Sequence, residues 1–332
     1  MLRAIVLGLV YAVFSATVLA SEVQWSPLPF DALRKMAAHG DVDAQYEVGL
    51  RYLAGQRGAP SDHREAFKWL NAAAERGSAR AQYELGVMYT NGKGVPSDYV
   101  QAVSWFRKSA EQGYANGQYN LGVMYANGDG VSQDYAQAIV WFRKAAEQGY
   151  IDAQGSLGLI YGEGMGVPKD YQQALGWYRK AAEQGNAQAQ ANLGMMYHDG
   201  LGVLQDDQQA AAWFHKAAEQ GNAVAQHNLG TLYQDGNGVA QDYPQAVMWY
   251  RKSAEQGHAN GLYSLGAAYL GGYGVQQNQV LAYVCALLAA QRNPSEDYQR
   301  FRNEVASQLT PAQLAVGQKL AGEWEAGVPL PE

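Results

Sequence analysis

The chain has 332 residues, a formal net charge of -7 and a hydrophobic content of 48%. This acidic balance argues against binding to nucleic acid or to an anionic membrane surface, because both need a positively charged face. The single cysteine, Cys285, excludes an intrachain disulfide framework and a multi-thiolate metal site. The apolar content is ample for a packed core.

The first twenty residues have the pattern of a secretory signal peptide. Arg3 gives a positive start, residues 4–14 are apolar and uncharged, and Val18 to Ala20 offers small residues for a signal peptidase. We expect cleavage after Ala20 and a periplasmic or secreted mature protein without a membrane span. The alternative is an uncleaved membrane anchor, for which the apolar run is at the short end.

A 36-residue period organises most of the chain. The columns that recur with this step are Trp69, Trp105, Trp141, Trp177, Trp213 and Trp249; Gly86, Gly122, Gly158, Gly194, Gly230 and Gly266; and Tyr89, Tyr125, Tyr161, Tyr197, Tyr233 and Tyr269. The series extends backward to Gly49 and Tyr52 and forward to Cys285, which takes the place of a tryptophan. One structural unit is therefore repeated seven times.

The first half of each unit is predicted to be a helix. In the second unit, Ala81, Leu85 and Tyr89 are spaced four apart and form one apolar stripe. Gly86 lies beside this stripe, and glycine inside a helix costs ~1 kcal/mol relative to alanine. Its recurrence suggests that another backbone approaches closely there. The helix should end in the glycine-rich turn at 91–95.

The second half of each unit is predicted to be a helix that starts at an aspartate. Asp98 is followed three residues later by Gln101, which is the spacing of a capping box. An apolar stripe through Trp105 follows, and Gly113 closes the helix. The aspartates that share this position are Asp62, Asp98, Asp134, Asp170, Asp206 and Asp242.

These patterns predict an all-α fold. A single helix pair cannot bury its tryptophan and tyrosine, so neighbouring pairs must stack and share a continuous core. No window alternates apolar and polar residues for long enough to form a sheet. We expect a right-handed α-solenoid of seven helix-turn-helix repeats with helical caps, whose inner surface is lined mostly by the first helices.

The unit resembles the Sel1-like repeat, a relative of the tetratricopeptide repeat. The resemblance rests on Ala-Gln-x-x-Leu-Gly-x-x-Tyr-x-x-Gly-x-Gly-Val followed by Asp-Tyr-x-x-Ala-x-x-Trp-Phe-x-Lys-Ala-Ala-Glu-Gln-Gly. Gly117 and Gly261 depart from it, because the pattern has alanine there. The resemblance implies an exported bacterial adaptor that binds partner proteins. Some cysteine-rich members are described as binding or hydrolysing β-lactams, but this chain lacks their cysteine pairs.

The expected domains are a signal peptide (1–20), an N-terminal segment with a capping helix (21–41), the repeat solenoid (42–293), and C-terminal capping helices with a tail (294–332). The N-terminal capping helix should run from Phe30 to His39. At the other end, helices are expected over 295–309 and 312–326, the second with Thr310 as its N-cap. Trp324 is expected to cover the last core layer.

No pattern in the chain indicates catalysis. The Gly-x-Gly turns lack the strand and third glycine of a dinucleotide site, and no Gly-x-Ser-x-Gly motif occurs. Cys285 stands in a core position, so burial is expected rather than reactivity. A zinc site built from His198, His227, Asp199 and Asp235 lacks close ligand spacing. We predict no catalytic residues, no metal and no cofactor.

Residues that vary on the first helices are the candidates for binding another protein. The predicted contact residues are Tyr46, Tyr83, Tyr119, Leu53, Thr90, Met195, His198, His227 and Gln234. The tyrosines are the proposed aromatic anchors, since amphipathic aromatics are favoured at protein interfaces. The alternative is that these tyrosines pack between units.

The sequence therefore predicts an exported, non-enzymatic scaffold that binds a partner protein in a concave groove. One subcase is an immunity or inhibitor protein for an envelope-acting effector such as a secreted lipase; another is a regulator of an envelope sensor. The alternatives from other classes are a β-lactam or cell-wall hydrolase, and an architectural protein that binds peptidoglycan.

Overall fold

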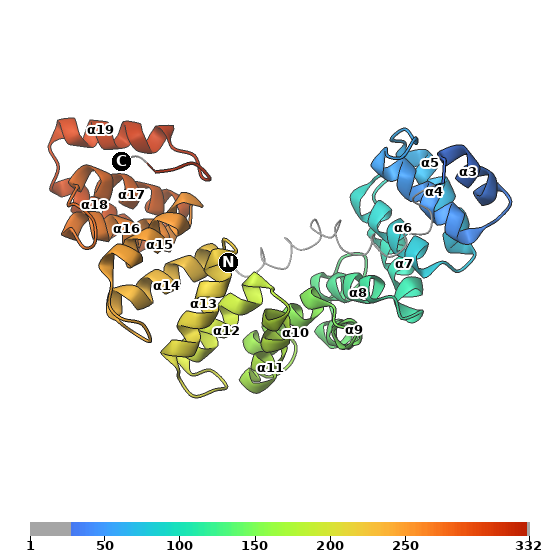
Figure 1. Ribbon diagram of the computed structural model, residues 1–332, viewed down its shortest axis with the longest axis horizontal. Helices are drawn as coiled ribbons and strands as arrows, with labels where there is room; N and C mark the ends of the chain where they lie inside the picture. Colours follow the sequence, from blue (N-terminus) through green and yellow to red (C-terminus); the bar gives the residue numbers. More distant parts are fainter. Residues whose placement is uncertain (1–27, 331–332) are drawn as a thin grey trace. The chain divides into compact units, whose positions relative to one another are not determined.

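The computed structural model describes residues 28–330, and the regular structure within that range is entirely α-helical (Figure 1). The predicted signal peptide lies outside the described residues. The helices are α3 (Phe30–Ala38), α4 (Val42–Ala54), α5 (His63–Glu75), α6 (Ala79–Asn91), α7 (Tyr99–Glu111), α8 (Ala115–Asn127), α9 (Tyr135–Glu147), α10 (Ile151–Glu163), α11 (Tyr171–Glu183), α12 (Ala187–Asp199), α13 (Asp207–Glu219), α14 (Ala223–Asp235), α15 (Tyr243–Glu255), α16 (Ala259–Gly271), α17 (Gln279–Arg292), α18 (Glu296–Ser307) and α19 (Pro311–Glu323).

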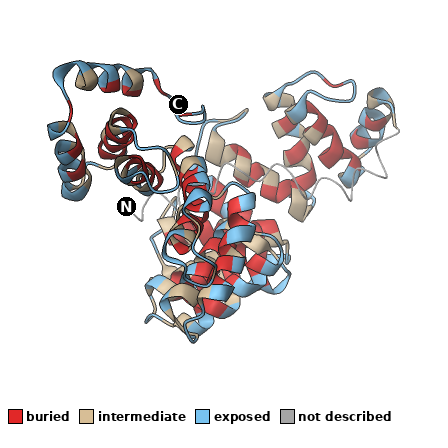
Figure 2. Cartoon of the chain, turned by 60° about the vertical axis from the view of Figure 1, so that its left-hand side comes forward, coloured by how far each residue is buried: buried red, intermediate tan, exposed pale blue. Residues whose placement is uncertain are grey.

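The chain divides into two compact units, Met1–Lys169 and Asp170–Glu332. The division falls between α10 and α11, so one predicted repeat gives its first helix to unit 1 and its second helix to unit 2. Within each unit, consecutive helices pack against one another up to α18, α19 packs on α17, and the buried residues lie between the helices (Figure 2). None of the helices from α3 to α19 is long and apolar enough to span a membrane.

A glycine of the first helix meets an aromatic ring of the second helix in most pairs. A Cβ on Gly86 would stand 2.5 Å from the Phe106 ring, and one on Gly122 would stand 2.7 Å from the Phe142 ring. Both phenylalanines are buried. The expected close approach is therefore present, but an aromatic side chain occupies the space beside the glycine where we expected a backbone.

The tryptophans are less buried than expected. Trp105 and Trp141 are half-buried, and only Trp249 in this column reaches the buried class in the described chain. The ammonium of Lys108 lies 3.9 Å from the Trp105 ring centroid, and the same cation–π contact recurs at Trp141, Trp177, Trp213 and Trp249. After Trp105, Trp141, Trp213 and Trp249, the next residue is aromatic and fills the gap at the glycine, which leaves the indole at the edge beside a lysine.

Buried glutamines link neighbouring helix pairs within each of the two compact units. The side-chain amide of Gln118 donates to the Ala110 carbonyl (3.2 Å), and its oxygen accepts from Gln148 (2.7 Å). The Ala110 carbonyl lies in the last turn of α7, where it also accepts the backbone N–H of Gly113 at 3.0 Å. The same pair of bonds is made by Gln82, Gln190 and Gln226. These bonds fix the register between neighbouring repeats.

Arginine replaces glutamine at both ends of this series. Arg76 stands 36 positions before Gln112 in the donor column, and the Oε1 atom of Gln45 is buried without a hydrogen-bond partner in the described chain. Arg76 instead lies beside Gly40 at the end of the capping helix α3. Arg292 occupies the same column at the other end and lies over the Trp324 ring.

The predicted caps are largely confirmed. Each aspartate of the expected column accepts a bond from the backbone amide three residues later, as Asp98 does from Gln101 (3.0 Å). The complete reciprocal capping box is formed by Thr310 and Gln313. Trp324 is buried in the C-terminal core, as expected. Cys285 is also buried there, and burial raises the pKa of its thiol to about 12.

The glycines that depart from the repeat pattern are matched by serines. Ser109 of α7 donates to the Ala79 carbonyl at 2.7 Å, and a Cβ on Gly117 would stand 2.5 Å from the Ser109 hydroxyl oxygen. Ser253 and Gly261 repeat this pairing in unit 2. Neighbouring repeats have alanine at both positions, as at 145 and 153. The extra oxygen of the serine therefore occupies the volume that the glycine leaves free.

We predict that Gly117→Ala destabilises the protein by about 1–3 kcal/mol, because overpacking of a tight contact has this typical cost. The double variant S109A/G117A restores the alanine pair of sister repeats and should recover most of the loss, with a coupling energy above about 1 kcal/mol. Chemical denaturation measures both effects. Gly176→Ala is the control, since a Cβ at this exposed helical position meets no atom within 4 Å and should stabilise. Purely additive effects at 109 and 117 would contradict the volume argument.

Candidate partner-binding surface

Tyrosines line the first helices of unit 1 and pack in pairs. The rings of Tyr83 and Tyr114 are 5.7 Å apart, and those of Tyr119 and Tyr150 are stacked at 4.9 Å. Tyr46 stands next to the Arg80 guanidinium at 4.7 Å. We call these five tyrosines, which lie on or at the start of α4, α6, α8 and α10, the tyrosine row.

The three predicted anchors are packed between neighbouring repeats. Tyr46 and Tyr83 are 6% exposed and Tyr119 is 2% exposed. Burial is the main cause that raises the pKa of each phenol above its ordinary value, so the hydroxyls are neutral at physiological pH. This arrangement agrees with the alternative that the tyrosines pack between neighbouring repeats. Truncating them to alanine would remove core contacts, so their role in binding another protein stays a prediction.

Two half-buried carboxylates lie among these tyrosines. Glu84 of α6 interacts electrostatically with the phenols of Tyr46 and Tyr83, and burial raises the pKa of its carboxyl to about 7. Asp152 of α10 interacts in the same way with Tyr119 and Tyr150, and burial raises its pKa as well. Neither carboxylate has a hydrogen-bond or ion-pair partner within residues 28–330.

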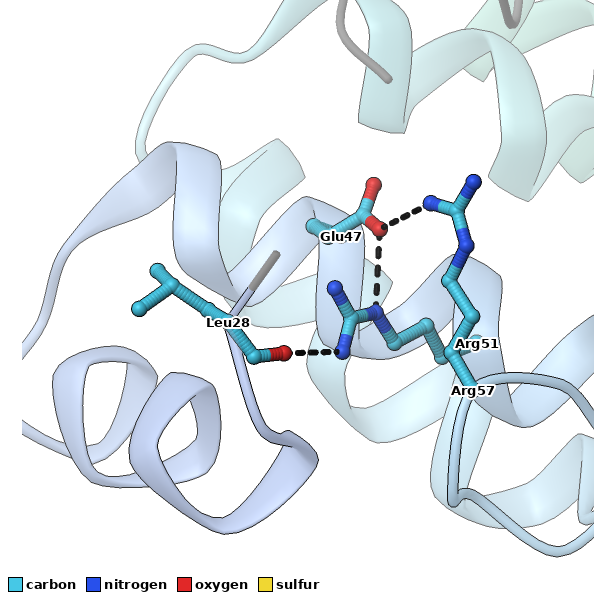
Figure 3. Close-up of polar contacts among 4 residues, drawn as sticks. All are labelled: Leu28, Glu47, Arg51 and Arg57. Atoms are coloured by element: carbon cyan, nitrogen blue, oxygen red, sulfur yellow. Dashed lines mark hydrogen bonds and ion pairs between the residues drawn. The ribbon is translucent and has the colours of Figure 1, made fainter. Parts of the chain in front are cut away.

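The equivalent glutamate of the first repeat shows what Glu84 lacks. Glu47 is bonded to the Arg51 guanidinium at 3.0 Å and lies 3.6 Å from Arg57 (Figure 3). Arg51 also donates to the Leu28 carbonyl. Burial of a carboxylate is costly unless a positive charge and hydrogen bonds compensate it. Glu47 has that compensation inside the chain, whereas Glu84 does not.

The row also contains unused hydroxyls and open space near Asp152. The phenol oxygens of Tyr119 and Tyr150 are buried without a hydrogen-bond partner in the described part of the chain. Gly155 takes the column position that holds tyrosine in the three preceding repeats, and no atom lies within 4 Å of where its Cβ would stand. The row therefore ends in a site with free polar groups and room for another side chain.

The other predicted residues of unit 1 lie at the edge of the packing. Leu53 is half-buried against the N-terminal core of α4 and α5. Thr90 is half-buried, and its hydroxyl donates to the Gly86 carbonyl of its own helix at 2.9 Å.

In unit 2, the structure brings two of the predicted residues together around Tyr250. The His227 ring lies 5.7 Å from the Tyr250 ring, and the Tyr250 hydroxyl donates to the Gln234 side chain at 3.2 Å. Met195 is 40% exposed on α12. His198 does not approach His227 as the zinc hypothesis required; its Nδ1 atom pairs with Asp207 at 2.6 Å. Across residues 28–330, no cluster of three or more His, Cys, Asp or Glu side chains could hold a metal ion.

His227 makes the contacts that come nearest to a catalytic arrangement. Its Nε2 atom is 3.2 Å from the Ser264 hydroxyl, and its Nδ1 atom is 3.2 Å from the Asn228 side-chain oxygen. Burial lowers the His227 pKa, and burial together with His227 lowers the pKa of the adjacent His258 to about 4. Ser264 lies inside helix α16, where backbone amides are used in helical bonds and cannot form an oxyanion hole. We assign no catalytic role to this cluster.

The sequence analysis missed Glu84, Asp152, Tyr114 and Tyr150. The signal was present, because Tyr114 and Tyr150 stand in an N-cap column that holds Ser78, Asn186 and Asn222 in sister repeats. Glu84 likewise stands in a column of asparagine and serine from the third repeat onward. A search for departures from the repeat on every face would have identified these residues.

Comparison with known proteins gives the family of the chain. The Sel1 repeat family matches seven consecutive segments, at residues 42–78, 79–114, 115–150, 151–186, 187–222, 223–258 and 259–294. Each matched segment begins at the start of the first helix of a pair, from α4 to α16.

A crystal structure of a Sel1 repeat protein from Oxalobacter formigenes is similar, with 34% identity and a TM-score of 0.68 over 83% of this chain and 79% of that one. A protective antigen of uropathogenic Escherichia coli has 27% identity over 89% of this chain and 94% of that chain, with a TM-score of 0.46.

Among curated proteins, the ERAD-associated E3 ubiquitin-protein ligase component HRD3A of Arabidopsis thaliana is 37% identical over 65 residues. That match covers 20% of this chain and 10% of the relative, so the chain spans about a tenth of the relative's length. The seven matched segments, the all-helical fold and the similarity to the Oxalobacter protein together show that the chain belongs to the Sel1 repeat family.

Proposed function

We propose that this protein is a non-enzymatic scaffold that binds another protein along the first helices of its repeats. The observation that carries the proposal is the contrast between the two kinds of position. Residues that hold the helices together recur in most repeats, whereas Glu84, Asp152 and the hydroxyls of Tyr119 and Tyr150 have no hydrogen-bond or ion-pair partner in the described chain. Polar groups left in this state are expected to find their partners in a complex.

The packing suggests how such a scaffold would bind. Glycine–aromatic contacts and glutamine bonds hold each helix pair against the next, so the side chains of the row have fixed positions before a partner arrives. A rigid surface loses less conformational entropy on binding than a flexible one. Affinity would then come from a small number of central contacts rather than from the whole area.

The finer part of the proposal concerns location and partner. The N-terminal pattern supports export to the periplasm or the medium. In that compartment the partner is proposed to be a secreted effector that acts on the bacterial envelope, such as a lipase, which this protein would occlude. A regulatory role toward an envelope sensor is the alternative within the same binding mode.

We predict that substitutions on the first helices weaken partner capture without unfolding the chain. Thr90→Arg in unit 1 combined with Met195→Asp in unit 2 should reduce affinity by tenfold or more, since a new charge in a packed interface is strongly unfavourable. The product of a neighbouring gene is the first partner to test, by titration calorimetry. Purified protein should not hydrolyse β-lactams or peptidoglycan.

The matched control is Val100→Arg combined with Val140→Asp, which places the same two charges at exposed positions of second helices. Circular dichroism should give the same melting temperature for both double variants. An equal loss of partner affinity in the two double variants would show that the first helices are not the binding surface. Turnover of a cell-wall substrate would contradict the non-enzymatic role.

We further predict that the mature protein begins at Ser21. Expression of the full chain in a Gram-negative host, followed by fractionation and intact mass measurement, should find the processed form in the periplasm or the medium. An unprocessed chain that stays in the cytoplasm or the membrane would contradict the export proposal.

A further inference from the structure

The charges of the first helices in unit 1 are balanced except at two positions. Asp43 pairs with Arg80 at 2.7 Å, Glu47 pairs with Arg51 at 3.0 Å, and Glu163 lies 4.0 Å from Lys169. Glu84 and Asp152 are the remaining charged residues of α4, α6, α8 and α10. They leave two carboxyl groups beside the tyrosine row with which no described residue forms an ion pair.

Each of these carboxylates stands beside tyrosine rings. Glu84 follows Tyr83 on α6 and interacts with Tyr46, while Asp152 lies near the stacked pair of Tyr119 and Tyr150. A carboxylate beside aromatic faces suits an alkylammonium or guanidinium group, because the carboxylate supplies the opposite charge and the rings supply cation–π attraction. The chain already uses this combination once, where Arg80 pairs with Asp43 and lies over the Tyr46 ring.

Independent features near Asp152 also point to a missing occupant. The Tyr119 side chain is 2% exposed, yet its hydroxyl and that of Tyr150 have no hydrogen-bond partner in the described chain. The Asp152 carboxylate and the Tyr150 ring are half-buried, so they are the parts of this cluster that a basic side chain can reach. Gly155 leaves space in the column where sister repeats place a tyrosine. The site therefore has acceptors, aromatic faces and room.

The two carboxylates are on different repeats, with α8 between α6 and α10 in the stack. A single small cation is not suited to contact both. We propose that the tyrosine row binds a lysine- or arginine-rich segment of the partner protein, with one basic side chain at Glu84 and another at Asp152. This inference rests on the proposed scaffold function and names the chemistry that its partner must present.

The test uses the full mature chain and capped hexa-arginine and hexa-lysine peptides, with capped hexa-glutamate for comparison. Isothermal titration at low and moderate salt should detect the basic peptides only. The isosteric double variant E84Q/D152N should weaken their binding by about tenfold or more, because it removes two charge-assisted contacts without changing side-chain shape. Signals of labelled tyrosines should shift in the wild type when the peptide binds.

The control is E111Q/E147Q, which removes the same two charges from exposed positions on second helices of unit 1. It should change affinity by less than about threefold, since exposed charges separated from the site are screened. Equal weakening by both double variants would show general attraction to an acidic protein and would overturn the inference. Failure of both basic peptides to bind at millimolar concentration would overturn it as well.

The pH dependence provides a second readout. Because burial raises the pKa of Glu84 to about 7, this carboxyl takes up a proton as the pH falls from 8 to 6 and loses its attraction for a cation. Affinity for the peptide should fall over that range in the wild type and change less in E84Q. An equal pH dependence in both proteins would remove Glu84 as a binding group.

Failure of this inference can be told apart from failure of the scaffold proposal. If a partner binds the wild type and E84Q/D152N equally well, the scaffold proposal still holds. The proposal that a basic segment of the partner binds at Glu84 and Asp152 is then wrong. A partner whose capture is lost in E84Q/D152N and kept in E111Q/E147Q supports both.

Discussion

The close contact between a helical glycine and an aromatic ring is the interaction on which the rest of the structure depends. At Gly86 and Gly122, the ring of the second helix fills the volume that a side chain would take. The loss of helix propensity at the glycine is offset by burial of a whole aromatic side chain. The same contact recurs at Gly194 and Gly230, so the two helices of these pairs meet in the same way.

This repeated contact also explains why one face of the repeat can vary. Once glycine, aromatic ring and glutamine set the packing, half-buried residues of the first helix such as Glu84 are not needed for it. Glutamate, asparagine and serine can therefore share one column at Glu84, Asn120 and Ser156. Positions that the packing does not require can differ between repeats. Unpaired charges and open space at these positions are therefore a better guide to a binding site than the recurrent residues.

The fold was accessible from the sequence because its determinants recur with a fixed period. The helix starts at the aspartates, the glycine-closed ends and the burial of Trp324 and Cys285 all follow from local patterns. The extent to which each aromatic residue is buried could not be predicted from these patterns, because the tryptophan and the residue after it could each fill the gap beside the glycine. Phe106 fills it, and Trp105 remains half-buried with Lys108 over its ring.

The candidate site was harder to predict for a related reason. Periodicity identifies what neighbouring repeats share, whereas the site depends on side chains that meet from different repeats. Glu47 and Glu84 occupy equivalent positions, and only the structure shows that two arginines compensate the first and none compensates the second. The pairing of Ser109 with Gly117 was equally hidden, because each residue taken alone looks like a minor departure from the pattern.

The arginines at the two ends of the glutamine series determine how the number of repeats can change. An interior repeat begins and ends with the same donor and acceptor, so a copy inserted beside it would find both of its bonds. Each glutamine lies eight residues from the carbonyl that it bonds, so a gain or loss of residues within that span would break the bond locally and leave later repeats in register. Arg76 and Arg292 are fitted to the capping helices and cannot serve in the middle. The array can therefore be lengthened or shortened in whole repeats between its two ends.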